Sequence, residues 1–175
     1  MAAKGDEVYK IRRNRFICIK KGSEETVPKK KPTYKENDLV VTIHHAEGLD
    51  NPRRYPDVSS RYYKVVFWVH PNEEYETQCV LGKPHPVWNS QRCIELNRSL
   101  DTQFLYVEVL RYGYPGSSPD PASSSSVGLT VVGRAKIPLT RSKRKITDRQ
   151  VLYRAAGDTH RVEGQIVYTL EIFRQ

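Results

Sequence analysis

The chain has 175 residues and a formal net charge of +9, with 29 lysines and arginines against 20 aspartates and glutamates. At ~100–200 residues per domain, this length allows one domain and leaves little for a second. Hydrophobic residues make up 38% of the chain, below the ~45–50% of typical globular domains, so part of it is expected to be poorly ordered. No apolar run approaches the ~18–20 residues of a membrane span, and the N-terminus has neither a secretory signal nor a myristoylation glycine. Three scattered cysteines argue against a disulfide framework and favour reduced thiols in a cytosolic protein.

The positive charge is concentrated near the N-terminus. Residues 1–37 hold 11 lysines and arginines against 5 acidic residues, whereas residues 38–175 hold 18 against 15. Residues 1–37 are therefore predicted to form a basic N-terminal extension and linker, in which residues 8–20 form either one extra edge strand or an amphipathic arm. Such an asymmetry suggests an arm for a polyanion, and a solubilising tail is the alternative.

From residue 38 onward the pattern predicts β-strands and no helix. Apolar and polar residues alternate, or β-branched and aromatic residues cluster, in eight segments bounded by turn residues. They cover residues 39–45, 62–69, 75–81, 92–96, 104–110, 131–139, 149–154 and 163–174. Eight short strands over residues 38–175 predict an all-β, eight-stranded antiparallel β-sandwich. The segment 113–128, with three prolines, three glycines and six serines, is predicted to be a long loop at one end.

The order of these segments resembles the C2 domain family. The resemblance rests on VVTIHHAEGL (40–49), SSRYYKVVFWV (59–69), the tract Pro86-Val87-Trp88-Asn89, FLYVEVL (104–110) and the closing GQIVYTLEIF. It covers about residues 38–175, and the single-domain layout is similar to the small C2 proteins common in plants. The resemblance implies the C2 sandwich fold.

Alternation also predicts which side chains fill the core. Trp88, between a proline-rich turn and a strand, is expected to cap one end of the core. Trp68 would point away from the core, either as a binding surface or packed under a loop. The remaining core candidates are Phe67, Val69, Leu105, Val107, Val109, Ile166, Tyr168 and Leu170.

The resemblance implies a calcium site, but the residues argue against one. C2 domains that bind Ca²⁺ use about five aspartates on two loops, and Ca²⁺ needs ~6–8 oxygen ligands. The family's Ser-Asp-Pro-Tyr tract is here Ser59-Ser60-Arg61-Tyr62, and its Asp-x-Asp is Arg111-Tyr112-Gly113. Only three candidate metal ligands remain, Asp50, Asp57 and Asp120, beside four loop arginines, Arg53, Arg54, Arg61 and Arg111. Like charges repel the ion, so no cofactor and no tight Ca²⁺ binding are expected.

Without calcium, attraction to a membrane would have to come from the chain's own cations. Each lysine or arginine near an anionic leaflet contributes about 1 kcal/mol. The resemblance adds Tyr63 and Lys64, because some C2 domains bind phosphoinositides through a tyrosine and a lysine of an early strand. The basic candidates from the residues themselves are Arg141, Lys143, Arg144 and Lys145 after the strand 131–139, and Lys29, Lys30 and Lys31 in the linker.

The sequence therefore predicts a membrane-targeting module that binds anionic phospholipids through basic patches, with little or no dependence on Ca²⁺, and that also recruits partners. It would be cytoplasmic and peripheral at the plasma membrane, with the nucleus as an alternative site. A protein–protein interaction scaffold is the alternative function. RNA binding through the basic arm ranks below both, since no RNA or DNA module is recognisable. No G-x-S-x-G, P-loop or paired catalytic carboxylates appear, so the chain is not expected to be an enzyme.

Overall fold

The computed structural model describes residues 8–12, 15–19, 38–56, 61–82, 85–96, 103–112, 129–139 and 144–173. The chain divides into two compact units, residues 1–33 and residues 34–175. In the first unit, β1 (Val8–Arg12) pairs antiparallel with β2 (Arg15–Ile19). Where the sequence allows one extra strand, the structure therefore has a two-stranded hairpin of its own.

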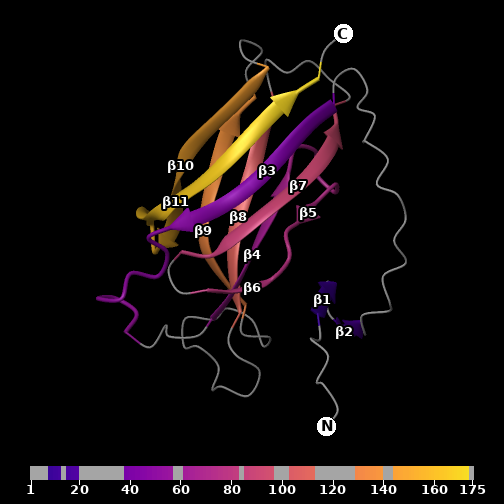
Figure 1. The fold of residues 1–175 in the computed structure, drawn as a ribbon. Coiled ribbons are helices and arrows are strands. Elements are labelled where there is room, and N and C mark those ends of the chain that lie inside the picture. The colour runs from indigo at the N-terminus through magenta and orange to yellow at the C-terminus, as the bar shows by residue number, and fades with distance from the viewer. Residues whose placement is uncertain are drawn as a thin grey trace. The chain divides into compact units, whose positions relative to one another are not determined.

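The second unit is all-β and antiparallel, as the sequence predicts (Figure 1). Its elements are β3 (Asp38–Glu47), β4 (Arg61–Trp68), β5 (Tyr75–Glu76), β6 (Val80–Gly82), β7 (Val87–Glu95), β8 (Phe104–Tyr112), β9 (Leu129–Pro138), β10 (Lys145–Ala156) and β11 (Thr159–Ile172). The strand predicted over residues 75–81 is split into β5 and β6, which both pair with β4. Among the described residues, no helix is long and apolar enough to span a membrane.

The strands form two layers that face each other across one core. The strand order is β5-β4-β8-β9-β10-β11-β3-β7, and β9 joins β10 through a single register pair, Tyr153 with Arg134. In Figure 1 the layer β10-β11-β3-β7 lies in front of the layer β9-β8-β4. Buried side chains of both layers belong to one hydrophobic cluster, as expected for two sheets that alternate apolar and polar residues.

The predicted core is confirmed. All eight residues expected from alternation are buried, and Trp88 is 3% exposed with its indole Nε1 donating to the Tyr63 carbonyl oxygen at 3.1 Å. This bond ties β7 of one layer to β4 of the other. The indole thus supplies both apolar area and a cross-layer hydrogen bond.

Four pairs of strand ends meet at one end of the sandwich. These are the end of β3 with the start of β4, the end of β6 with the start of β7, the end of β8 with the start of β9, and the end of β10 with the start of β11. We call this end the loop end. The link between β9 and β10, the start of β3 and the end of β11 lie at the opposite end, where the Ile172 amide donates to the Arg144 carbonyl and the Phe173 amide to the Asp38 carbonyl.

Candidate functional site

A buried carboxylate, Asp50, organises the loop end. It follows β3 by three residues, adopts a positive φ of 44° and is 1% exposed. The Tyr63 hydroxyl donates to its Oδ2 at 2.7 Å, the Arg111 guanidinium donates to its Oδ1, and Arg154 Nη1 approaches the same Oδ1 at 3.4 Å. The carboxylate therefore has a donor on each oxygen, which is what a buried charge requires.

The charge network continues from Asp50 into the hairpin β10-β11. Arg154 Nη1 lies 3.4 Å from Oε1 of Glu163, and Arg161 Nε lies 3.4 Å from Oε2 of the same carboxylate. Arg111 and Glu163 are buried at 1% and 3% exposure. Because a buried ion loses its hydration, the alternation of arginine and carboxylate is needed to keep these charges inside the fold.

Tyr55 holds the loop onto these arginines. Its hydroxyl oxygen accepts from Arg154 Nη1 at 2.9 Å and from Arg161 Nη2 at 2.6 Å. The guanidinium carbon of Arg154 lies 4.9 Å from the centre of the tyrosine ring, and that of Arg111 lies 5.9 Å from it. Hydrogen bonds and cation–π contacts thus fix the end of the loop that follows β3.

Between Asp50 and Tyr55 the chain makes one closed turn. The Arg53 amide donates to Oδ1 of Asn51 at 2.9 Å, and the amides of Arg54 and Tyr55 donate to the Asn51 carbonyl at 2.9 Å each. Asn51 thereby acts as a turn-forming residue, in the way that asparagine side chains commonly bond to backbone two residues on. Arg53 and Arg54 are exposed on this turn.

A family model for the C2 domain matches residues 37–152 of the chain. The chain belongs to the C2 domain family. C2 domains are in general membrane and phospholipid-binding modules and are typically non-catalytic. A comparison with curated proteins found no match.

Solved C2 structures share the fold at low identity. A C2 domain of plant Extended Synaptotagmin 1 superposes with a TM-score of 0.55 at 16% identity, over 82% of this chain and 100% of that one. A C2 domain-containing protein from a putative elicitor-responsive gene gives 0.52 at 15% identity, over 83% and 96%. The structure of CC2D1B gives 0.59 at 13% identity and covers 96% of this chain, which spans 63% of that longer one.

The residues present do not fit a calcium ion in the way that the C2 family would use one. Asp50 is the only one of the three candidate ligands among the described residues, and its oxygens already accept from a tyrosine and two arginines. An oxygen in such contacts would have to release a guanidinium before it could bind a metal. Asp57 and Asp120 lie outside the described residues. In the part of the chain that the structure describes, no three His, Cys, Asp or Glu side chains gather as metal ligands.

Two predicted lipid contacts are buried in this C2 domain, which speaks against that role. Tyr63 is 0% exposed, because it shares the inward face of β4 with Val65 and Phe67, so that Tyr62 is the tyrosine on the outer face. Lys64 does point outward, yet it is 7% exposed and its ammonium lies 2.6 Å from Glu76. Arg111, predicted as part of the loop surface, is likewise buried, and its guanidinium pairs with Asp50.

Lys64 is a structural cation. Desolvation by burial lowers its pKa, but the hydrogen bond from Lys64 to Glu76, together with the nearby Tyr112, outweighs burial and raises the pKa above the usual 10.5. The ammonium also lies 5.8 Å from the centre of the Tyr112 ring. A charge held in this way is not available to a headgroup.

The other predicted cations that the structure describes lie at two opposite ends of the sandwich. Arg53 and Arg54 are exposed at the loop end, whereas Arg144 and Lys145 are exposed at the opposite end, where Lys145 lies 3.4 Å from Glu171. The side chain of Arg61 and the predicted contacts Lys29, Lys30, Lys31, Arg141 and Lys143 lie outside the described residues.

Trp68 lies on the outer face of the sheet, half-buried, at the end of β4 away from the loop end. Its ring stacks on Tyr106 with a centroid distance of 5.7 Å and an interplanar angle of 13°. Phe104 follows at 6.4 Å, and the Lys136 ammonium lies 3.9 Å from the Phe104 ring centre. The predicted outward direction is correct, and the Tyr106 ring covers part of the indole.

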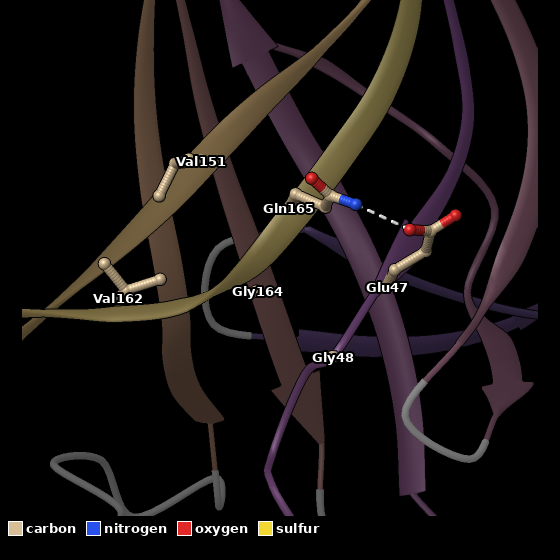
Figure 2. A pocket seen from close by; sticks show the side chains of 6 residues that line it. All are labelled: Glu47, Gly48, Val151, Val162, Gly164 and Gln165. Carbon is tan, nitrogen blue, oxygen red and sulfur yellow. Dashed lines mark hydrogen bonds between the residues drawn. The ribbon is translucent and has the colours of Figure 1, made fainter.

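An open pocket of about 290 Å³ lies beside the loop end on the outer face of β3, β10 and β11 (Figure 2). Glu47, at its wall, accepts from Gln165 at 2.6 Å and contacts His45 at 3.0 Å, and these hydrogen bonds lower its pKa. Gly164 allows the two strands to approach, since a Cβ there would lie 2.2 Å from the Glu47 carbonyl. The carboxylate is already engaged, so this pocket offers no free charged group.

Tyr55, Arg154, Arg161 and Glu163 are the site residues that sequence analysis missed. The pairs that link the hairpin β10-β11 to the loop after β3 join residues far apart along the chain, 106 residues for Arg161 and Tyr55, whereas Arg154 and Glu163 are only nine residues apart. One local signal was present in the sequence. Arg154 lies two residues after the buried Leu152, so alternation along β10 places both side chains on the inward face.

Proposed function

We propose that this C2 domain binds anionic phospholipid surfaces through its own fixed cations and without coordinating Ca²⁺. The observation that carries the proposal is the Asp50–Arg111 ion pair. At the end of β8, where the resemblance to calcium-binding C2 domains implies an aspartate, the chain has Arg111, and its guanidinium pairs with Asp50. A permanent cation thus pairs with the carboxylate that would otherwise be open to a metal, which supports binding without Ca²⁺.

The energetic argument depends on the number of exposed cations. At about 1 kcal/mol for each lysine or arginine near an anionic leaflet, four to eight cations give useful affinity. Among the described residues, Arg53 and Arg54 are exposed at the loop end, and Arg144, Lys145 and Lys136 are exposed toward the opposite end, so only one of these two groups can face a flat leaflet at a time. The basic residues of the N-terminal extension and of residues 141–143 add to this supply.

Co-sedimentation with vesicles tests the proposal. The chain should bind vesicles that contain an anionic phospholipid and not neutral vesicles, in the presence of chelator, and binding should fall as salt is added because exposed charges are screened. The variant Arg141→Gln/Lys143→Gln/Arg144→Gln/Lys145→Gln should bind less than wild type. If the chain does not bind anionic vesicles at low salt, the proposal is wrong.

A protein-interaction scaffold is the second candidate, and the aromatic row Trp68–Tyr106–Phe104 favours it. These rings with Lys136 form an amphipathic strip on an outer sheet face, of the kind enriched at protein interfaces. Pull-down of a partner that is lost in a Tyr106→Ser variant, together with absence of vesicle binding, would favour this function over the first.

A further inference from the structure

The two outer faces of the sandwich differ in character. On the layer β10-β11-β3-β7, one row of paired positions across the four strands is polar and consists of Thr147, Thr169, Thr42 and Gln91. On the layer β6-β4-β8-β9, the row of paired positions nearest the loop end is apolar and aromatic and consists of Leu81, Tyr62, Tyr112 and Leu129. An antiparallel sheet with one face on the core usually has a polar outer face. The first face therefore suits water, and the second does not.

The apolar surface continues along the strands of the second layer. Val66 of β4, Leu110 of β8 and Val131 of β9 lie between the apolar row and the stacked rings of Trp68 and Tyr106. Leu110 is 8% exposed although it does not belong to the hydrophobic core cluster. We call the surface from the apolar row to these rings the aromatic face. A contiguous apolar surface of this kind marks a site of interaction with another molecule.

The charges of the aromatic face are paired within it. Lys64 Nζ lies 2.6 Å from Oε2 of Glu76, and Arg134 Nε lies 2.7 Å from Oε1 of Glu108. The Lys136 ammonium lies 3.9 Å from the centre of an aromatic ring. Because each carboxylate is already neutralised by a neighbouring cation, the face attracts an anionic leaflet weakly and repels an apolar protein surface weakly. These pairs favour a protein as the molecule that covers the face.

The positions of the charges select a second copy of the chain. Glu76 lies on β5 at one margin of the face, and Arg134 lies at the same level on β9 at the other margin. A two-fold axis that runs along the strands, between β4 and β8, places β9 of one copy over β5 of the other. Arg134 of each copy then faces Glu76 of the other copy. An axis across the strands would place Arg134 over Arg134, where like charges repel each other.

The size of the face is sufficient for a weak dimer. The strand β8 has nine residues, so at about 3.3 Å per residue the face is about 30 Å long, and four strands at about 4.8 Å make it about 19 Å wide. Two such faces bury roughly 1,200 Å² in total, which is the lower end of the range for specific interfaces. We therefore expect a dissociation constant in the micromolar range.

We infer that the aromatic face binds a second copy of this chain, in a two-fold dimer whose axis runs along the strands. The two sheets pack face to face, in the way that the two layers of the sandwich pack inside each copy. The inference does not depend on lipid binding. For the protein-interaction candidate, it names the partner.

Sedimentation of the full chain tests the inference. The mass of wild type should rise from 20.2 kDa toward twice that value between low and high micromolar concentration. Val66→Arg places a cation in the centre of the aromatic face, and Val167→Arg places one on the outer face of β11, where the valine is equally half-buried. The first should weaken dimerisation at least about tenfold, because the centre of an interface is desolvated. The second should change it no more than about twofold.

Two charge reversals test the direction of the axis. Glu76→Arg and Arg134→Glu should each weaken self-association, because each places like charges opposite one another across the axis. An equimolar mixture of the two variants should recover dimers, because Arg134 of the first variant then faces Glu76 of the second, and the two introduced residues face each other. Thermal midpoints of both variants confirm that they are folded, since Glu76 also pairs with Lys64.

Each remaining outcome overturns a stated part of the inference. A wild type that stays monomeric at every concentration overturns the dimer, with lipid as the occupant if Val66→Arg alone loses vesicle binding, and a different protein otherwise. A dimer weakened equally by Val66→Arg and Val167→Arg overturns the assignment to the aromatic face. A mixture of the charge-reversed variants that stays monomeric overturns the direction of the axis. Vesicle binding by wild type decides the proposed function separately.

Discussion

Removal of the Arg111 guanidinium should destabilise the domain strongly. Arg111→Met leaves Asp50 charged in a site where its side chain has no exposed surface. Breaking a buried ion pair from one side costs about 3–5 kcal/mol. The Tyr63 hydroxyl and Arg154 still face the carboxylate, so we expect about 3 kcal/mol, near the lower limit of that range. At about 3–4 °C per kcal/mol for a domain of this size, the thermal midpoint should fall by roughly 10 °C.

Urea unfolding and calorimetry measure this loss of unfolding free energy. The proteins compared are wild type, Arg111→Met, Asp50→Asn and the double variant, which together form a double-mutant cycle. The double variant should be less destabilised than Arg111→Met alone, because it contains no unpaired buried charge. A loss below about 1 kcal/mol for Arg111→Met would be typical of an exposed pair and would refute the reasoning.

Position 111 also tests whether an arginine takes the role that calcium would have at this site. Arg111→Asp should be less stable than Arg111→Met in chelator, because the new carboxylate repels Asp50. Ca²⁺ should then restore part of the stability of this variant by binding its folded state, and should leave the melting of wild type unchanged. Stabilisation of wild type by Ca²⁺ would contradict the account.

Three further outcomes follow from the geometry. Tyr63→Phe should lose about 1.5–3 kcal/mol of unfolding free energy, since its hydroxyl bonds to a buried carboxylate, and should leave vesicle binding unchanged, which melting and co-sedimentation check. Lys64→Gln should also leave vesicle binding unchanged. Because Glu76 raises the pKa of Lys64, the stability that this pair contributes is fully present below pH 10.5 and is lost as pH rises through the folded pKa. The unfolding free energies of wild type and variant should therefore converge only in strong alkali. Gly164→Ala should cost at least ~1 kcal/mol, because φ is +97° and a Cβ would collide with the Glu47 carbonyl; an unchanged urea midpoint would show that the strands can separate freely there.

The fold was predictable because alternation is a local property of the chain. The spacing of Leu105, Val107 and Val109 marks the inward face of β8 before any contact is known, and all three are buried. The same rule, extended to the next inward position, reaches Arg111. Burial of Arg111 was therefore readable from the sequence, although its partner was not.

Tyr63, which the resemblance implies as a lipid contact, shows how a family pattern and the strand pattern can give different predictions. Phe67 lies on the inward face by alternation, and Tyr63 lies four residues before it on the same face. The strand parity therefore predicts a buried tyrosine at position 63, whereas the resemblance implies an exposed one. Successive side chains of a strand face opposite sides of the sheet, so parity decides between core and surface.

The pairs that form the loop end could not be read from the sequence. Asp50 and Arg154 are 104 residues apart, and Tyr55 and Arg161 are 106 apart. No periodicity relates positions on different strands at that separation, because their proximity depends on how the two layers pack. The ion-pair network around Asp50 therefore consists of tertiary contacts, which local patterns in the sequence do not reveal.

The most direct measurement of the central claim is a binding isotherm on vesicles containing an anionic phospholipid, recorded in chelator and again in free Ca²⁺ at equal ionic strength. The account predicts two superimposable curves, because Arg111 already neutralises Asp50 and the exposed arginines supply the attraction. Binding that appears only with Ca²⁺ would contradict it, since the carboxylates of the loop end would then be free to hold the ion.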